Sequence, residues 1–294
     1  MQFVSPEHFP QARHLGDFEP DSAEWHEARR MSIGGSEIGT IMGLNQWESA
    51  YALWAKKLGL IPDSFQDNWA TRLGKAFEEP ILELFGQEHP ELEIYRAGTF
   101  REAYDYPYLH ANPDAIAMDK ASGEFIIVEV KTARYAWDSV PPQYEAQVQQ
   151  YMYVMGLEKA IIVAVAGMEW NEYIIERDDF QIAAQLMQAK SFYECLEFGM
   201  KPDWDGSEHT YQAVRQQHPQ IDDTEVDLQT LGLQLLNAQA MAEEATENLT
   251  RLKSMVLDNM GYAKTGFIVQ DGQKRKVTSR QARRDGAPYL VIHK

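Results

Sequence analysis

The spacing of apolar residues changes several times along the chain, and each spacing predicts a type of secondary structure. Apolar residues three and four apart predict helices over 20–30, 48–59, 68–89, 142–156, 179–199 and 225–259. Apolar runs bounded by turn residues predict strands over 93–100, 108–111, 114–119 and 125–132, then a strand pair, KAIIVAVAG and EWNEYIIER. This order of elements predicts an α/β core with one central mixed sheet and helices on both faces.

The pattern changes after Gly199. Residues 1–200 hold the predicted core, whereas residues 201–224 are polar and rich in turn residues, which predicts a connecting segment. Residues 225–294 form a C-terminal appendage, with a long helix followed by a small basic β-hairpin over 262–294. Because a long apolar helix is rarely stable alone, we expect it to pack on the core or on a neighbouring subunit.

Composition sets limits on the class of protein. The 294 residues are 44% hydrophobic, which is enough for a sizeable core. The single cysteine, Cys195, excludes an intrachain disulfide and a four-cysteine zinc or iron–sulfur site. No apolar run approaches the ~20 residues of a membrane helix, and no basic and then apolar leader opens the chain. A cytoplasmic protein without a membrane partner is expected.

The net charge of −18 argues against a protein that coats DNA generally. The charge is uneven, because residues 261–294 carry +6 and the rest of the chain carries −24. A local basic channel is compatible with an acidic exterior, since only contacted phosphates count in DNA binding. The dense basic cluster, which is either a DNA-backbone contact or a solvated tail, comprises Lys274, Arg275, Lys276, Arg280, Arg283 and Arg284.

Candidate chemistry gathers in two neighbouring predicted strands. Glu129 and Lys131 lie two apart in the apolar strand FIIVEVKT, so their side chains share one face. A hairpin through Ser122-Gly123 would bring Asp114, which follows Pro113, beside Glu129. Two carboxylates suit a hard divalent ion such as Mg²⁺, and an adjacent lysine can stabilise charge on a phosphate. The alternative interpretation is a surface ion pair between Glu129 and Lys131.

This arrangement, Pro113-Asp114 followed by Glu129-x-Lys131, resembles that of the PD-(D/E)xK nuclease superfamily. Three further blocks narrow the resemblance to the lambda-exonuclease and YqaJ-type viral recombinase family. The resemblance as a whole covers residues 25 to about 200. The blocks are WHEARRMSIGGS at 25–36, GKAFE at 74–78 and AQVQQY at 146–151.

The resemblance implies a fold and an activity. The fold is a restriction-endonuclease-like core, with a central mixed sheet flanked by helices. The activity is a Mg²⁺-dependent 5′-to-3′ exonuclease acting on double-stranded DNA ends, which leaves 3′ overhangs for recombination by single-strand annealing. Each site would hold two Mg²⁺ ions, for which Mn²⁺ substitutes. The implied partners are two further copies in a trimeric ring and a phage-type single-strand annealing protein.

The resemblance also implies roles for particular residues. Asp114, Glu129 and the backbone carbonyl of Val130 would bind metal beside Lys131. An acidic residue on the 68–89 helix would complete the metal shell. Glu78 fits this role better than Glu79, and only one of the two can face the site because neighbours on a helix diverge by ~100°.

A second group of residues would bind a 5′-phosphate. Arg29, for which Arg30 is the alternative, and Ser36 beside Gly34-Gly35 match the positions that grip this phosphate in the family. Ser36 is also a suitable N-cap for a helix over 37–43. On the 142–156 helix, Gln147 and Tyr151 share a face, and Gln147 is expected near Lys131 or the scissile nucleotide. His110 is a candidate to brace the site. The DNA-binding set is Arg29, Ser36, Gly35 and Tyr151.

Two other functions remain open. A restriction or structure-specific endonuclease of the same superfamily would share Asp114, Glu129 and Lys131 but would not require Arg29 or Ser36. A non-catalytic DNA-end-binding module would have no physical need to hold the charged set together. Closed circular DNA separates the first alternative from an exonuclease, and binding without cleavage would indicate the second.

Overall fold

The structure, a computed structural model, describes residues 1–18, 22–62, 69–284 and 286–293. The chain forms two compact units, Met1–Ile221 and Asp222–Lys294. In the first unit a 3₁₀ turn over Pro6–His8 precedes the helices α1 (Ala23–Arg30), α2 (Gly35–Ile41), α3 (Ala50–Lys57), α4 (Trp69–Glu88), α5 (Pro142–Met155), α6 (Asp179–Phe198) and α7 (Glu208–Gln217).

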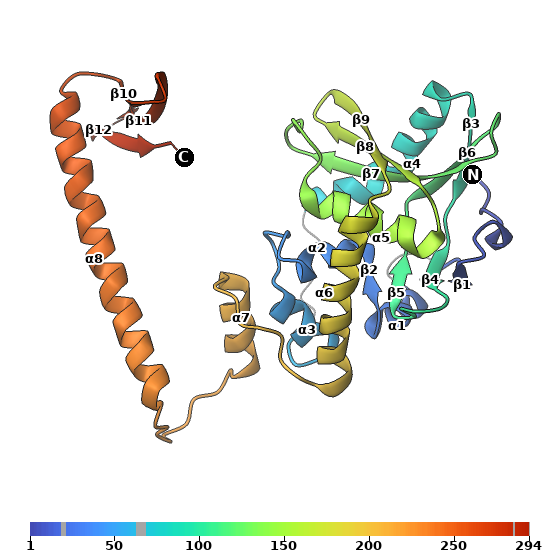
Figure 1. Ribbon diagram of the computed structural model, residues 1–294, viewed down its shortest axis with the longest axis horizontal. Coiled ribbons are helices and arrows are strands. Elements are labelled where there is room, and N and C mark those ends of the chain that lie inside the picture. Colours follow the sequence, from blue (N-terminus) through green and yellow to red (C-terminus); the bar gives the residue numbers. More distant parts are fainter. Residues whose placement is uncertain (19–21, 63–68, 285, 294) are drawn as a thin grey trace. The chain divides into compact units, whose positions relative to one another are not determined.

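A five-stranded sheet lies at the centre of this unit (Figure 1). In spatial order its strands are β3 (Leu92–Arg96), β6 (Ala115–Asp119), β7 (Phe125–Ala133), β8 (Lys159–Ala166) and β9 (Glu169–Glu176). Neighbouring strands run antiparallel except β7 and β8, which are parallel and are joined by the crossover helix α5. The predicted central mixed sheet with flanking helices is confirmed.

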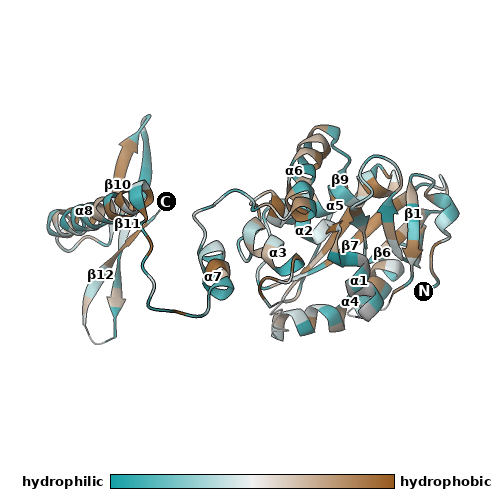
Figure 2. Ribbon diagram, turned by 90° about the horizontal axis from the view of Figure 1, so that it is seen from below, coloured by the Kyte–Doolittle hydropathy of each residue, from teal (hydrophilic) through white to brown (hydrophobic). Residues whose placement is uncertain are grey.

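Side chains of β7 alternate between two hydrophobic clusters, one on each face of the sheet. Figure 2 shows hydrophobic stretches along the strands of this sheet. Val128 and Val130 pack with the α4 residues Ile81, Leu82 and Phe85. Ile127 points to the opposite face, in the cluster that contains Ala146, Val148 and Met152 of α5. Because strand side chains alternate, Glu129 and Lys131 share the face of Ile127 and are directed toward α5.

A second sheet of four strands was not predicted. Its order is β1 (Ala12–Gly16), β4 (Thr99–Glu102), β5 (Leu109–Ala111) and β2 (Ile33–Gly34). The single strand predicted over 93–100 is in fact two strands, β3 and β4, that belong to different sheets. Gly98 lies between them and approaches β1 so closely that a β-carbon would be 2.6 Å from His14 Nε2. A larger residue where the chain passes from one sheet to the other would therefore require the His14 side chain to move.

Residues 201–224, predicted as a connecting segment, contain helix α7, which packs against α3. The Thr210 hydroxyl donates to Ser49 Oγ at 2.8 Å, and the Tyr51 hydroxyl donates to Gln217 Oε1 at 3.1 Å. These contacts extend the first unit to Ile221. The turn-rich composition of the segment obscured a helix of ten residues.

Helix α4 continues through Pro80, at which a kink or a late start was predicted. Proline cannot donate a backbone hydrogen bond, so one bond of this helix is missing at that point. Of the predicted helices, residues 20–21 and 68 lie outside the described part of the chain.

The second unit contains α8 (Gln229–Met260) and an antiparallel sheet of β10 (Thr265–Gln270), β11 (Gln273–Arg283) and β12 (Gly286–Ile292). The predicted hairpin thus has a third strand. Asp271 and Gly272, both at positive φ, form the turn between β10 and β11, as Asp-Gly pairs do in tight hairpins. Among the described residues, no helix combines the length and apolarity needed to cross a membrane.

Candidate active site

The register of β6 and β7 sets the first two acidic side chains opposite each other. Ala115 pairs with Val128, so Asp114, one residue before β6, lies across from Glu129. The Val130 N–H donates to Asp114 Oδ2 at 2.7 Å. The hairpin through Ser122-Gly123 therefore brings Asp114 and Glu129 together, as the sequence pattern predicts.

Glu129 is a buried carboxylate with one satisfied oxygen. Its Oε1 accepts hydrogen bonds from Lys131 Nζ and from Gln147 Nε2, each at 2.6 Å. Its Oε2 is buried and accepts no hydrogen bond from any described residue. A buried carboxylate oxygen without a partner is costly, and this atom is open to a cation or a water.

Two adjacent glutamates of α4 have different surroundings. Burial raises the pKa of Glu78, and the negative charge of Glu129 raises it further. Glu79 instead pairs with Arg96 at 3.1 Å on the surface. The structure thus brings Glu78 within electrostatic range of Glu129 and directs Glu79 to Arg96.

The pKa shifts of the other groups reflect crowding of negative charge. Burial raises the pKa of Asp114 well above its ordinary value, and Glu129 and Glu78 raise it further. Burial by itself would lower the pKa of Lys131, but the Glu129 and Asp114 carboxylates outweigh burial and raise it. Lys131 is therefore held as a cation, and its Nζ lies 4.9 Å from the centre of the Tyr144 ring.

The oxygen donors of this site suit a hard divalent ion, although the carboxylates do not already surround a coordination site. Within the ranges that the structure describes, no three His, Cys, Asp or Glu side chains converge closely enough to hold a metal by themselves. Lys131 and Gln147 occupy Glu129 Oε1, and like charges resist convergence without a cation. The carboxylates of Asp114 and Glu78, together with the unpartnered Glu129 Oε2, are oxygen ligands of the kind that a hard divalent ion prefers.

Helix α5 links the acidic site to a second polar group. Gln147 donates both to Glu129 and, at 2.9 Å, to the Tyr151 hydroxyl. Burial raises the pKa of Tyr151 well above its ordinary value, with a further contribution from Glu129, so the hydroxyl stays protonated. A β-carbon on Gly35 would overlap the Tyr151 ring, so glycine is needed where α2 crosses α5.

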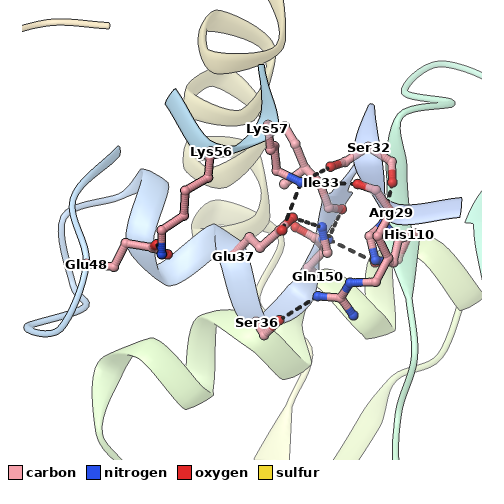
Figure 3. A network of polar contacts seen from close by, with 11 residues as sticks. Arg29, Ser32, Ile33, Ser36, Glu37, Glu48, Lys56, Lys57, His110 and Gln150 are labelled. Carbon is pink, nitrogen blue, oxygen red and sulfur yellow. Dashed lines mark hydrogen bonds and ion pairs between the residues drawn. The ribbon is translucent and has the colours of Figure 1, made fainter. Parts of the chain in front are cut away.

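The second polar group contains Arg29 and Ser36, which lie side by side in Figure 3. Arg29 Nη2 donates to Ser36 Oγ at 3.2 Å. Arg30 turns away and pairs with Glu27, with its side chain 63% exposed. The structure therefore brings Arg29, and not Arg30, to Ser36 and the start of α2.

Ser36 is not the N-cap that the sequence predicted. Helix α2 begins at Gly35, and the Glu37 carboxylate accepts the N–H of the N-cap residue Gly34 at 2.8 Å. Glu37 thus satisfies the N–H of the N-cap residue, and the Arg29 and Ser36 side chains supply further polar groups beside the start of the helix.

A buried lysine that sequence reasoning missed supports this group (Figure 3). Lys57 Nζ donates to the backbone carbonyls of Arg29 (3.1 Å) and Ser32 (2.8 Å) and pairs with Glu37 at 2.8 Å. Glu37, three residues after the N-cap Gly34, has the spacing of a capping-box residue and was visible in the sequence. Lys57 had no local signal, because all of its partners are 20 or more residues away.

His110 lies behind Gly34. A hydrogen bond of 2.9 Å joins its Nδ1 to Ser32 Oγ, and a β-carbon on Gly34 would be 2.7 Å from its Nε2. Burial lowers the pKa of His110 well below its ordinary value, and Arg29 and Lys57 lower it further. The position of His110 in the sequence suggested that it lies beside Asp114. The structure instead places this neutral histidine against Ser32 and Gly34, next to Arg29.

The basic cluster has a different setting. Lys274, Arg275, Lys276, Arg280 and Arg283 are on β11 and Arg284 follows it, all in the second unit. Its contact with DNA stays a prediction.

Comparison with known proteins agrees with this geometry. Residues 24–158 match the YqaJ-like viral recombinase domain. Protein YqaJ of Bacillus subtilis is 27% identical over 262 residues, which span 83% of this chain and 80% of that protein. The crystal structure of an alkaline exonuclease, LHK-Exo from Laribacter hongkongensis, is similar in fold with a TM-score of 0.50 and 20% identity, covering 61% of this chain and 94% of that one.

These matches confirm the resemblance inferred from the four sequence blocks. The domain match spans the blocks that carry Arg29, Glu78, Asp114 and Gln147. Residues 24–158 of the chain thus match the YqaJ-like viral recombinase domain, and the chain shares its fold with the alkaline exonuclease LHK-Exo.

Proposed function

We propose that the protein is a Mg²⁺-dependent 5′-to-3′ exonuclease that acts on double-stranded DNA ends and leaves 3′ overhangs for single-strand annealing. The observation that carries the proposal is the continuous link from Glu129 through Gln147 to Tyr151, which packs on Gly35 beside Arg29. A carboxylate–lysine site and a phosphate-binding arginine joined through one helix suit hydrolysis at a DNA end.

On the acidic side, Asp114, Glu129, the Val130 carbonyl and Glu78 would hold Mg²⁺. A divalent cation there supplies Lewis-acid activation of water and charge stabilisation. Lys131, kept positive by its carboxylate neighbours, is placed to stabilise negative charge on the scissile phosphate. Gln147 fixes Glu129 Oε1, which orients the carboxylate and leaves Oε2 as the free ligand atom.

On the basic side, Arg29 and Ser36 would bind a terminal 5′-phosphate. Arginine offers a planar set of donors to phosphate oxygens, and the Ser36 hydroxyl adds another donor. Tyr151 adds a protonated hydroxyl between the two groups. A pocket that holds the terminal phosphate would fix which bond reaches the acidic site, and so would impose stepwise removal from 5′ ends.

The family resemblance suggests the assembly. Three copies in a ring around DNA would give processivity, and the acidic balance of −24 outside residues 261–294 suits docking of a single-strand annealing protein. Failure to bind a cognate annealing protein at micromolar concentration would remove that partner from the proposal.

Digestion of linear and closed circular duplex DNA tests the activity. We expect wild-type protein with Mg²⁺ to degrade the linear form only, and EDTA to abolish this. Lys131→Ala should lower the rate by about 10²-fold or more, the usual effect of removing a group that stabilises transition-state charge. Lys120→Ala is the matched control, because Lys120 lies in the β6–β7 hairpin and its Nζ donates to the Pro90 carbonyl. Cutting of circles would indicate the endonuclease, and binding without cleavage would indicate the non-catalytic module.

A further inference from the structure

Helix α8 is 32 residues long and contains no buried residue. Its large apolar side chains are open to solvent within the second unit: Leu231 and Leu235 are each 65% exposed, and Leu249 and Leu252 are each 43% exposed. A helix of this composition gains most of its stability from packing of its apolar face. The second unit by itself supplies little of that packing.

The exposed residues follow a heptad repeat. Eight of the nine core positions within α8, which recur alternately every three and four residues, are apolar, and this is the pattern of a coiled coil. The a positions are Leu235, Ala242, Leu249 and Val256, and the d positions are Leu231, Ala238, Ala245, Leu252 and Asn259. We call these nine residues the α8 seam.

The small sheet of the second unit leaves this seam open. The partly covered residues of α8's last turns are Lys253, Leu257 and Met260, at e, b and e positions beside the seam. Met260 is the one that meets β10, since a β-carbon on Gly266 would be 3.4 Å from Met260 Sδ.

The distribution of charge identifies the occupant of the seam. Of the six charged residues between 228 and 260, five lie at b, c or f positions, away from the seam, and only Lys253 flanks it. The g positions, which usually set partner choice in coiled coils, are the uncharged residues Gln234, Met241, Asn248 and Met255. Two identical helices therefore meet with almost no like-charge repulsion, and a charged partner helix would find no complement.

We propose that the α8 seam binds the α8 seam of a second copy of this chain, in parallel and in register, a pairing that links two chains whether or not their first units also belong to a ring of three. Asn259 selects this arrangement. In a parallel pair it meets its own copy and the two side-chain amides can bond each other, whereas in an antiparallel pair it would face an apolar a position of the partner helix, such as Leu235. The Leu layers at both ends and the Ala layers between them then stack on themselves.

Disulfide cross-linking of the full-length chain tests the proposal. Cys195 is first replaced by alanine, because it is the single native cysteine. Leu231→Cys then sets a thiol at a d position, where equal positions of parallel helices lie within disulfide reach. Oxidation with copper–phenanthroline should convert most chains to covalent dimers.

Leu233→Cys is the matched control. It is two residues away, is 64% exposed against 65% for Leu231, and lies at an f position on the opposite face. We expect cross-linking at least tenfold slower than for Leu231→Cys. A second variant combines Leu231→Cys with Leu235→Glu, which adds a charge to the seam. The added charge should slow cross-linking of Leu231→Cys by tenfold or more.

Nuclease activity of each variant reports whether the first unit remains folded. Three results would each overturn the proposal. The first is equal cross-linking at the two cysteine positions, and the second is no cross-linking at either because α8 docks on its own nuclease unit. The third is a cross-linking rate that Leu235→Glu does not change. These results are independent of the proposed exonuclease activity, because cross-linking needs neither DNA nor metal.

Discussion

At the scale of single residues, the site is defined by which atoms are satisfied and which are not. Glu129 Oε1 is held by Lys131 and Gln147, whereas its Oε2 has no partner among the described residues. Such an asymmetry orients a carboxylate with one oxygen free for a ligand. The same division separates two pairs of neighbours: Glu78 and Arg29 belong to the site, and Glu79 and Arg30 pair with surface residues.

Gln147→Ala tests the orienting hydrogen bond. Loss of a hydrogen bond to a charged group costs about 1.5–3 kcal/mol, so we expect nuclease activity to fall by about 10- to 100-fold. Gln149→Ala is the control, since Gln149 is equally buried on α5 but donates to the Glu176 carbonyl, away from the site. Gln149→Ala should lower the melting temperature without lowering activity per folded molecule. Equal activity losses in both variants would contradict the assigned role of Gln147.

Asp114 makes stability depend on pH. Because its pKa is raised in the folded state, its contribution to stability is fully present below pH ~3.9, the unfolded value, and is lost as pH rises through the raised pKa. Asp114→Asn removes that loss. In EDTA at pH 8 we expect the free energy of unfolding to increase, and we expect the gain to vanish toward pH 4.

Urea unfolding at pH 4 and pH 8 measures this effect, and Asp119→Asn is its contrast. Hydrogen bonds from Ser122 and Ala121 lower the pKa of Asp119, so its contribution is present above its unfolded pKa and is lost as pH falls. Asp119→Asn should therefore destabilise at pH 8. The same sign for both variants would contradict the raised pKa that burial and the neighbouring carboxylates give Asp114.

How far the sequence predicted the site depended on how local each contact is. A hairpin of known register brings Asp114 to Glu129, and helix periodicity brings Gln147 to Tyr151, so both pairs were predictable from spacing. Spacing does not decide between Glu78 and Glu79, because Glu79 is drawn away by Arg96, which the tertiary fold brings near. It does not decide between Arg29 and Arg30 either, because the pairing of Arg30 with Glu27 depends on side-chain rotamers. Asn259 and the heptad of α8 were likewise readable from spacing alone.

At the scale of elements, close crossings connect the two halves of the site. Helix α2 crosses α5 at Gly35, where the Tyr151 ring leaves no room for a side chain. Lys57 of α3 then ties the end of α1 to the start of α2 through two carbonyls and Glu37. These contacts hold Arg29 at Ser36.

Lys57→Met tests this support. Lys57 is 7% exposed, and removing one partner of a buried ion pair costs about 3–5 kcal/mol because the other charge is left unpaired. We expect this loss in urea unfolding, together with weaker binding of 5′-phosphorylated ends. Lys56→Met is the neighbouring control: the Lys56–Glu48 pair is more exposed, at 28% and 22%, and exposed pairs contribute about 0–1 kcal/mol. A smaller loss for Lys57→Met than for Lys56→Met would refute the bracing role.

The predicted secondary structure was wrong where one apolar run contributes strands to two different sheets. Residues 93–100 satisfy a strand pattern throughout, yet Gly98 divides them between two sheets through a close approach to His14 that no spacing reveals. Helix α7 was missed for the opposite reason: its residues are polar, and it is held by hydrogen bonds to α3.

At the scale of the whole molecule, chemistry and assembly belong to separate compact units. The first unit contains the acidic site and the Arg29 group, and the second contains the α8 seam and the basic cluster. The negative charge of the chain is concentrated outside residues 261–294, so the proposed binding to DNA would rely on local positive groups such as Arg29 and Lys131.

The central claim is that one connected site recognises a 5′-phosphate and cleaves next to it. The most direct measurement compares digestion rates of linear duplexes with 5′-phosphate and 5′-hydroxyl ends for wild type, Arg29→Ala and Arg30→Ala. We expect wild type and Arg30→Ala to prefer the phosphorylated end by about tenfold or more, and Arg29→Ala to lose that preference, because a charged hydrogen-bonded contact contributes about 1.5–3 kcal/mol. A preference that survives Arg29→Ala, or one that is absent from wild type, would contradict the account.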